Sequence, residues 1–217
     1  MNSNIEPSFY REYYLELLDL ARNFKLVEFQ KNLSETYEKL GTESFIIEFI
    51  APFVNFVGLS WENEDISIAN EHFCSDQITK FIHRKNIDIH KSNGIPKVLL
   101  TTIPNESHSI GITMAESILS LNGAECLSLS AETPLDEIVK TAIISQSNII
   151  GLSFSGHIAK NIEETSLVEI KKILPKTIDI WVGGNFSGTK IDGIEYLHLE
   201  DIKEKLANWR IKNIYSN

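Results

Sequence analysis

The sequence predicts an α/β protein in which an N-terminal four-helix bundle precedes a doubly wound, flavodoxin-like parallel sheet. Apolar residues recur at helical spacing over the first ninety residues, whereas short β-branched runs alternate with helical segments from residue 97 onward. Hydrophobic residues make up 42% of the 217 residues and charged residues 23%, which is typical of a globular chain. We therefore expect a helical domain over 1–90 and a sheet domain over 96–217.

The helical half is expected to contain four helices. Apolar spacing places them over 10–21, 26–37, 44–60 and about 67–84. Gly41-Thr42 separates the second helix from the third, and Pro52 predicts a kink within the third. Short connections favour an antiparallel bundle.

The second half follows a polar linker over 86–96 and alternates strands with helices. The strands are expected over 97–103, 125–129, 149–153, 178–182 and 194–197. The helices are expected over 109–121, 135–145, 162–173 and 200–210. This alternation predicts an open parallel sheet that binds ligands at the carboxyl ends of its strands.

The charge balance excludes a nucleic-acid-binding surface of the usual kind. The net charge is −10, with 9 basic and 15 acidic residues over 1–92, and 11 and 15 in the remainder. Since a nucleic-acid binder needs clustered Lys and Arg, direct nucleic acid binding is not expected.

Cysteine usage and apolar patterning predict a soluble cytoplasmic protein. Cys74 and Cys126 show no metal-ligand spacing and do not suggest a disulfide framework. The first residues lack the basic start and apolar core of a signal peptide. The longest apolar stretch, 45–59, is interrupted by Glu48 and Pro52, so no membrane association is expected.

Glu106, His108 and Gly111 form an E-x-H-x-x-G motif directly after the first strand. Imidazole is a common metal ligand, and a carboxylate two residues away can orient its other nitrogen. Glycine allows a ligand to approach the backbone closely. Taken alone, the motif favours a simpler alternative, in which Ser107 or Ser109 caps the next helix and His108 faces solvent.

Two further loops favour a ligand site at the same edge of the sheet. Ser153 and Ser155 follow the third strand, and Gly183 and Gly184 follow the fourth. Each pair alone is typical of a turn. Together they describe a narrow slot with polar groups, suited to a heteroaromatic tail.

These three motifs resemble the cobalamin-binding domain, over residues 97–210. The resemblance implies that His108 is the lower axial ligand of cobalt and that Glu106 hydrogen-bonds it, in place of the family's more usual Asp. It also implies that Gly111 makes room for the nucleotide tail of the cofactor. The residues implied to line the tail's slot are Ser153, Ser155, Gly183 and Gly184.

The helical half is similar to that of cobalamin-dependent photoreceptor regulators of the CarH/LitR type. Trp61 precedes the pair Glu71-His72 with nine residues between them. The resemblance implies that Trp61 stacks on the upper adenosyl group, that Glu71 and His72 make polar contacts to it, and that Ile68 belongs to the same cofactor-binding set. The alternative is a core Trp61 and a surface His72. Glu62 stands where some members have a His, which leaves the light-exposed state of the cobalt open.

The resemblance implies a light or cofactor sensor that binds adenosylcobalamin and is not itself an enzyme. Related regulators carry a basic DNA-binding domain, whereas this sequence begins in the helical half, so we expect signalling through a protein partner, a transcription regulator. Self-association into a homo-oligomer stays open. The alternative is a corrinoid methyl-carrier protein of a methyltransferase system. The other histidines fit no motif and are expected at the surface; they are His83, His90, His157 and His198.

Overall fold

The computed structural model describes residues 10–89, 93–129 and 131–214. It divides into two compact units, Met1–Lys85 and Asn86–Asn217. The first consists of helices and the second of a sheet with helices on both faces, so the predicted α/β class is confirmed. His90 lies outside the described residues.

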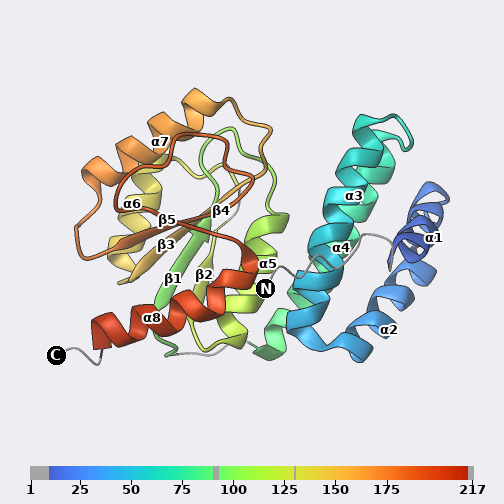
Figure 1. Cartoon of the computed structure of the whole chain (residues 1–217), viewed down its shortest axis with the longest axis horizontal. Coiled ribbons are helices and arrows are strands. Elements are labelled where there is room, and N and C mark those ends of the chain that lie inside the picture. The colour runs from blue at the N-terminus through green and yellow to red at the C-terminus, as the bar shows by residue number, and fades with distance from the viewer. Residues whose placement is uncertain (1–9, 90–92, 130, 215–217) are drawn as a thin grey trace. The chain divides into compact units, whose positions relative to one another are not determined.

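Over its described residues, the helical unit contains four α-helices and one π-helical segment (Figure 1). They are α1 (Arg11–Arg22), α2 (Leu26–Ser44), η1 (Phe45–Ile50), α3 (Ala51–Glu62) and α4 (Ile68–Ile89). Aromatic rings fill the interior of the unit. The centroid of the Phe49 ring lies 5.5 Å from that of Tyr14 and 5.8 Å from that of Phe45. Phe29, Phe49 and Phe53 are fully buried. The predicted four-helix arrangement is therefore held by an aromatic core.

Two details of this unit differ from prediction. The irregularity expected at Pro52 lies one turn earlier, because the π-helical segment Phe45–Ile50 precedes the proline, which takes a place in the first turn of α3. Helix α4 continues to Ile89 rather than ending near Arg84. No Gly or Pro stands between Arg84 and Ile89, and Asn86 is buried, so nothing local ends the helix there. The predicted break at Gly41 is confirmed by its φ of 71°.

One stretch among the described residues, Leu26–Glu62, is long and apolar enough to cross a membrane by length and composition alone. A core helix passes the same test. Its large residues Phe29, Phe45 and Phe53 are buried inside the helical unit. The buried side chains of this stretch therefore belong to the core of the helical unit.

In residues 93–129 and 131–214, the second unit contains a parallel sheet of five strands in the order β2-β1-β3-β4-β5. The strands are β1 (Lys97–Thr101), β2 (Glu125–Ser128), β3 (Ile149–Phe154), β4 (Asp179–Gly184) and β5 (Glu195–Leu197). The connecting helices are α5 (Ile110–Leu121), α6 (Leu135–Ile144), α7 (Lys160–Ile173) and α8 (Ile202–Ile214), the last preceded by the 3₁₀ turn η2 (Leu199–Asp201). Helices α6 and α7 cover one face and α5 and α8 the other (Figure 1). This order is the flavodoxin-like one that the sequence predicts.

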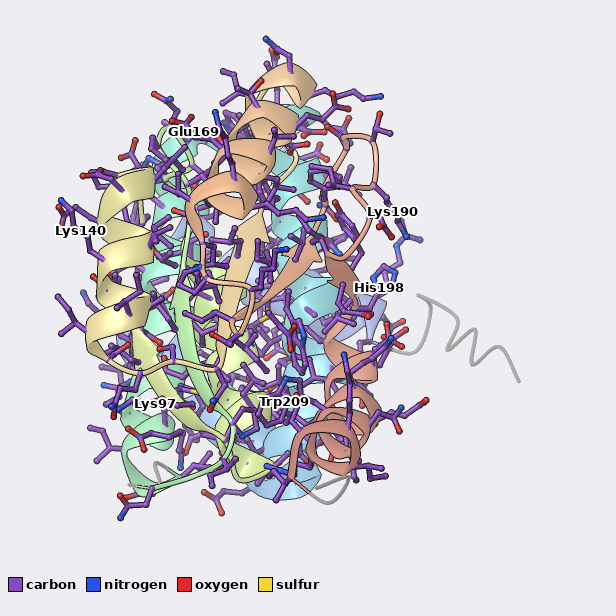
Figure 2. The ribbon with its side chains drawn as sticks, turned by 90° about the vertical axis from the view of Figure 1, so that its left-hand side faces the viewer. Lys97, Lys140, Glu169, Lys190, His198 and Trp209 are labelled. Atoms are coloured by element: carbon purple, nitrogen blue, oxygen red, sulfur yellow. The ribbon has the colours of Figure 1, made fainter. Side chains whose placement is uncertain are left out.

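The direction of the strands fixes where a ligand can bind. Trp209 of α8 donates a hydrogen bond from Nε1 to Oδ2 of Asp179, the first residue of β4, at 2.8 Å. Figure 2 shows Trp209 and Lys97, the first residue of β1, towards the bottom, with His198, which follows β5, higher. The carboxyl ends of the strands therefore lie at the edge away from Trp209.

Candidate functional site

The loop after β1 is fastened by Thr102. Its hydroxyl donates to the backbone oxygen of Glu106 at 2.5 Å and accepts the backbone N–H of Glu132 at 2.8 Å. Thr102 is fully buried. These bonds hold the segment that carries Glu106 and His108 against the loop after β2.

The Glu106 carboxylate joins the loops that follow β1 and β3. Its Oε1 accepts the backbone N–H and the Nδ1–H of His108, at 3.0 and 2.8 Å. Its Oε2 accepts the backbone N–H and the hydroxyl of Ser155, at 2.8 and 2.7 Å. Glu106 is 0% exposed, and burial by itself raises the pKa of a carboxyl, yet these four bonds outweigh it and hold the pKa at about 2. The carboxylate is therefore ionised at neutral pH.

The ionised carboxylate fixes the tautomer of His108. Because the ionised Glu106 can only accept hydrogen bonds, Nδ1 of His108 carries a proton, and Nε2 is the ring nitrogen that a metal would use. The side chain is 49% exposed although its partner is buried. Ser109, the N-cap residue of α5, makes no side-chain cap bond. This arrangement matches a histidine prepared to ligate a metal.

His157, which the sequence left among the surface residues, lies beside His108. The two ring centroids are 5.0 Å apart and the ring planes are inclined by 33°. The backbone N–H of His157 donates to the hydroxyl of Ser155 at 3.2 Å. His157 is exposed, as expected, but its position two residues after Ser155 was the signal that could have placed it at this site.

A largely apolar cavity of about 110 Å³ lies on the α5/α8 side of the sheet. The residues predicted for the tail's slot that line it are Gly111, Ser153, Gly183 and Gly184. Ser153 pairs in register with Gly183, which pairs with Leu197. A Cβ on Gly111 would lie 2.2 Å from Oγ of Ser153. The predicted motifs therefore meet at one cavity, and the contact between α5 and β3 requires glycine.

Two details of the slot escape the sequence. Ser155 bonds to Glu106 and does not line the cavity, unlike its predicted role. The lining residues that were missed include Trp181, Met114, Gly151 and His198. They come from a strand interior, a helix face and the turn after β5, and only the folded topology brings them together.

The four predicted residues of the helical unit lie near the ends of α3 and α4. Trp61 is 39% exposed, which contradicts a core role, and Ile68 is also exposed. Oε2 of Glu71 lies 2.5 Å from Nδ1 of His72, and Oε1 accepts the hydroxyl of Ser75 at 2.6 Å. The unit thus presents an exposed indole, an exposed isoleucine and a carboxylate–imidazole pair.

The metal-binding side chains of this site fit a metal ion that is already held by the ring of a cofactor. Within the described part of the chain, no group of three or more His, Cys, Asp or Glu side chains could hold an ion. His108 instead offers one imidazole, oriented by Glu106, in the unit that contains the cavity. A cobalt ion held by a corrin ring needs only one such protein ligand, so the residues present fit that group.

Comparison with known proteins supports the resemblance. The chain is 25% identical over 142 residues to the HTH-type transcriptional repressor CarH of Myxococcus xanthus, a match that covers 63% of this chain and 46% of CarH. The chain thus spans less than half the length of this relative. No family profile matches the chain. The predicted resemblance to the CarH type is confirmed at the level of sequence.

One solved structure confirms the fold. The monomethylamine corrinoid protein of Methanosarcina barkeri aligns with a TM-score of 0.70 at 13% identity, covering 92% of this chain and 99% of that one. The methanol:cobalamin methyltransferase complex MtaBC of the same organism aligns over 97% of this chain and 83% of that one, at 14% identity with a TM-score of 0.47. At these identities the first match shows a shared fold.

Proposed function

We propose that this chain binds a cobalamin-type corrinoid, with Nε2 of His108 as the lower ligand of cobalt. The observation that carries the proposal is the Glu106–His108 pair in the same unit as a cavity kept open by Gly111, Ser153 and Gly183. A corrinoid needs both features of this site. The oriented imidazole would ligate its metal, and the slot cleared of side chains would take its tail. The similarity to CarH supports the same assignment.

Each residue has a distinct task in this proposal. Glu106 holds the His108 ring by Nδ1 and, through Ser155, keeps the loops after β1 and β3 together. Gly111 and Ser153 leave room for the tail, and the apolar lining favours its aromatic end. Bound adenosylcobalamin supplies a cobalt–carbon bond that light can cleave.

The finer proposal is an adenosylcobalamin sensor that acts through a protein partner. Trp61 supplies an exposed ring for stacking, and the Glu71–His72 pair supplies polar groups, as the CarH-type resemblance implies. Loss of the contacts to these residues would bias the helical unit towards a second state, which a transcription regulator could recognise. The net charge of −10 makes a protein a better target than DNA.

The alternative is a methyl-carrier protein, which the fold match to a corrinoid protein over nearly its whole length favours. A carrier must leave the upper face of the cobalt open to partner enzymes. An adenosyl sensor instead needs contacts to its upper group. The two functions therefore differ in how strongly the upper ligand contributes to binding.

The direct test is reconstitution with adenosylcobalamin in the dark, followed by green light. We expect binding and an irreversible change of the absorbance spectrum, and we expect His108→Ala to lose the His-ligated spectrum while His83→Ala, on exposed α4 surface, behaves as wild type. Methylcobalamin bound as tightly as adenosylcobalamin would favour the carrier. Failure to bind any cobalamin would refute both functions.

Trp61→Ala separates the two functions within one variant. Loss of the stacked indole should weaken adenosylcobalamin about 5- to 10-fold, in line with the cost of losing one aromatic contact, and leave aquocobalamin affinity unchanged. Leu59→Ala, which removes another exposed side chain of α3, is the matched control. Equal weakening of both cobalamins, measured by absorbance titration, would make Trp61 a structural residue.

A further inference from the structure

We infer that His157 is a positioning residue for His108: its ring packs against the His108 imidazole and fixes the plane in which Nε2 is presented. This inference rests on the proposed function, since it concerns how the same histidine meets the metal. It is carried by the contact between the two rings, which no motif of the sequence predicts.

The hydrogen bond from Glu106 leaves the His108 ring incompletely oriented. The bond of 2.8 Å restrains Nδ1, but a hydrogen bond tolerates bending, so the ring keeps some freedom to turn about its Cβ–Cγ bond. Such a turn moves Nε2, the atom on the opposite side of the ring. A ligand that must meet a metal in one direction needs a second restraint, and His108 is half exposed, so buried packing does not supply all of it.

His157 supplies that restraint through its ring. A centroid separation of 5.0 Å and an inclination of 33° lie within the range of favourable aromatic pairs. The two rings are tilted against each other, and the described residues hold no group of three or more His, Cys, Asp or Glu side chains that could bind an ion with them. The contact therefore favours support of His108 over a shared metal ion.

The position of His157 is set by the carboxylate that holds His108. The backbone N–H of His157 donates to Oγ of Ser155, and that hydroxyl donates to Oε2 of Glu106. Gly156, with φ of 88°, turns the chain between Ser155 and His157, and a Cβ there would lie 3.1 Å from Cβ of Asn185. Glu106 thus places both the ligand and the residue that supports it.

A double-mutant cycle with cob(II)alamin tests the inference. His157→Ala should weaken binding about 2- to 12-fold, the factor expected for one aromatic pair, and should lower the fraction of protein whose electron paramagnetic resonance spectrum shows splitting by one nitrogen. His157→Phe keeps a flat ring and should restore both quantities. In the His108→Ala background, His157→Ala should change nothing. His83→Ala is the control for removal of an exposed histidine.

The outcomes distinguish failure of the inference about His157 from failure of the proposed function. If wild type binds with nitrogen splitting that His108→Ala abolishes, but His157→Ala matches wild type, the inference is wrong and the proposed function stands. Equal losses in both backgrounds, or failure of His157→Phe to restore splitting, also overturn the inference, because His157 then acts other than through the His108 ring. If wild type binds no cob(II)alamin, both fail.

Discussion

The two faces of the parallel sheet are built from the same strands but packed in opposite ways. On the α6/α7 face, β3 contributes Ile150, Leu152 and Phe154, all buried. On the α5/α8 face, the intervening positions of β3 are Gly151 and Ser153, and they line the cavity. Because neighbouring residues of a strand point to opposite faces, the run IIGLSF gives one filled face and one hollow face.

The difference shows which residues serve the fold and which leave room for a ligand. A parallel strand covered on both faces normally reads as a continuous apolar run. Large side chains on the α6/α7 face bury apolar area, and this contributes to the stability of the sheet unit. Small ones on the other face forgo that contribution. Phe154→Ala, which empties the filled face, and Gly183→Val, which fills the hollow face, test this division.

Emptying the filled face should have the largest effect on stability. Phe154 is 2% exposed and its ring lies 5.4 Å from that of Phe186. Phe154→Ala should lower the free energy of unfolding by about 3–5 kcal/mol, measured by urea denaturation, because it leaves a cavity in a packed layer. Ile144→Ala, at an exposed position of α6, should change it by less than about 0.5 kcal/mol. A loss below about 1 kcal/mol for Phe154→Ala would contradict tight packing of the α6/α7 face.

Acidification should remove the next largest contribution, that of Glu106. Its pKa lies at about 2 in the folded protein, below the ordinary value of 4.5, so ionisation favours folding. In the protein without cofactor, this stability is fully present above about pH 4.5 and is lost as the pH falls towards 2, with a total of about 3 kcal/mol. Glu106→Gln should lack this part of the pH profile. Parallel profiles for the variant and wild type, from urea denaturation between pH 2 and 6, would refute it.

The order of helices and strands could be predicted from sequence because each depends on local periodicity. The buried runs at β1, β3 and β4 are short and apolar, and the helices between them repeat apolar residues every three to four positions. The end of α4 was missed because Asn86 resembles a linker residue in sequence, whereas in the fold its side chain is buried and accepts a hydrogen bond from Ser117. That bond joins residues 31 apart in the chain, which no local pattern reveals.

The candidate site could be predicted only in part, for a similar reason. The pairing of Glu106 with His108 lies within one loop, and its spacing carried the prediction. The place of Ser155 on Glu106 and the contact of His157 with His108 depend on how the loop after β3 turns at Gly156. A sequence shows that such a loop is polar but not which way its side chains point.

The sequence also could not distinguish the roles of Gly183 and Gly184, the two glycines that end β4. Substitutions at these glycines test the two faces with the smallest expected change in stability. A Cβ on Gly183 would meet only the backbone oxygen of Leu197, at an ordinary 3.6 Å, and would point towards the cavity. Gly184 has φ of 82°, and a Cβ there would lie 2.1 Å from the backbone oxygen of Phe154. Gly183 is thus needed because it leaves room in the cavity, whereas Gly184 is needed because its backbone adopts a positive φ that disfavours a side chain.

Gly183→Val should therefore change the free energy of unfolding by less than about 1 kcal/mol, because a strand tolerates valine where no backbone strain arises. It should nevertheless weaken cobalamin binding at least about 10-fold, since the added methyl groups occupy space that the tail needs. Gly184→Ala, the matched control, should cost at least about 1–3 kcal/mol of stability, because backbone strain adds to the clash with the backbone oxygen of Phe154. Urea denaturation and absorbance titration measure the two quantities on the same preparations. If Gly183→Val bound cobalamin as tightly as wild type, the hollow face would not be the site of the tail.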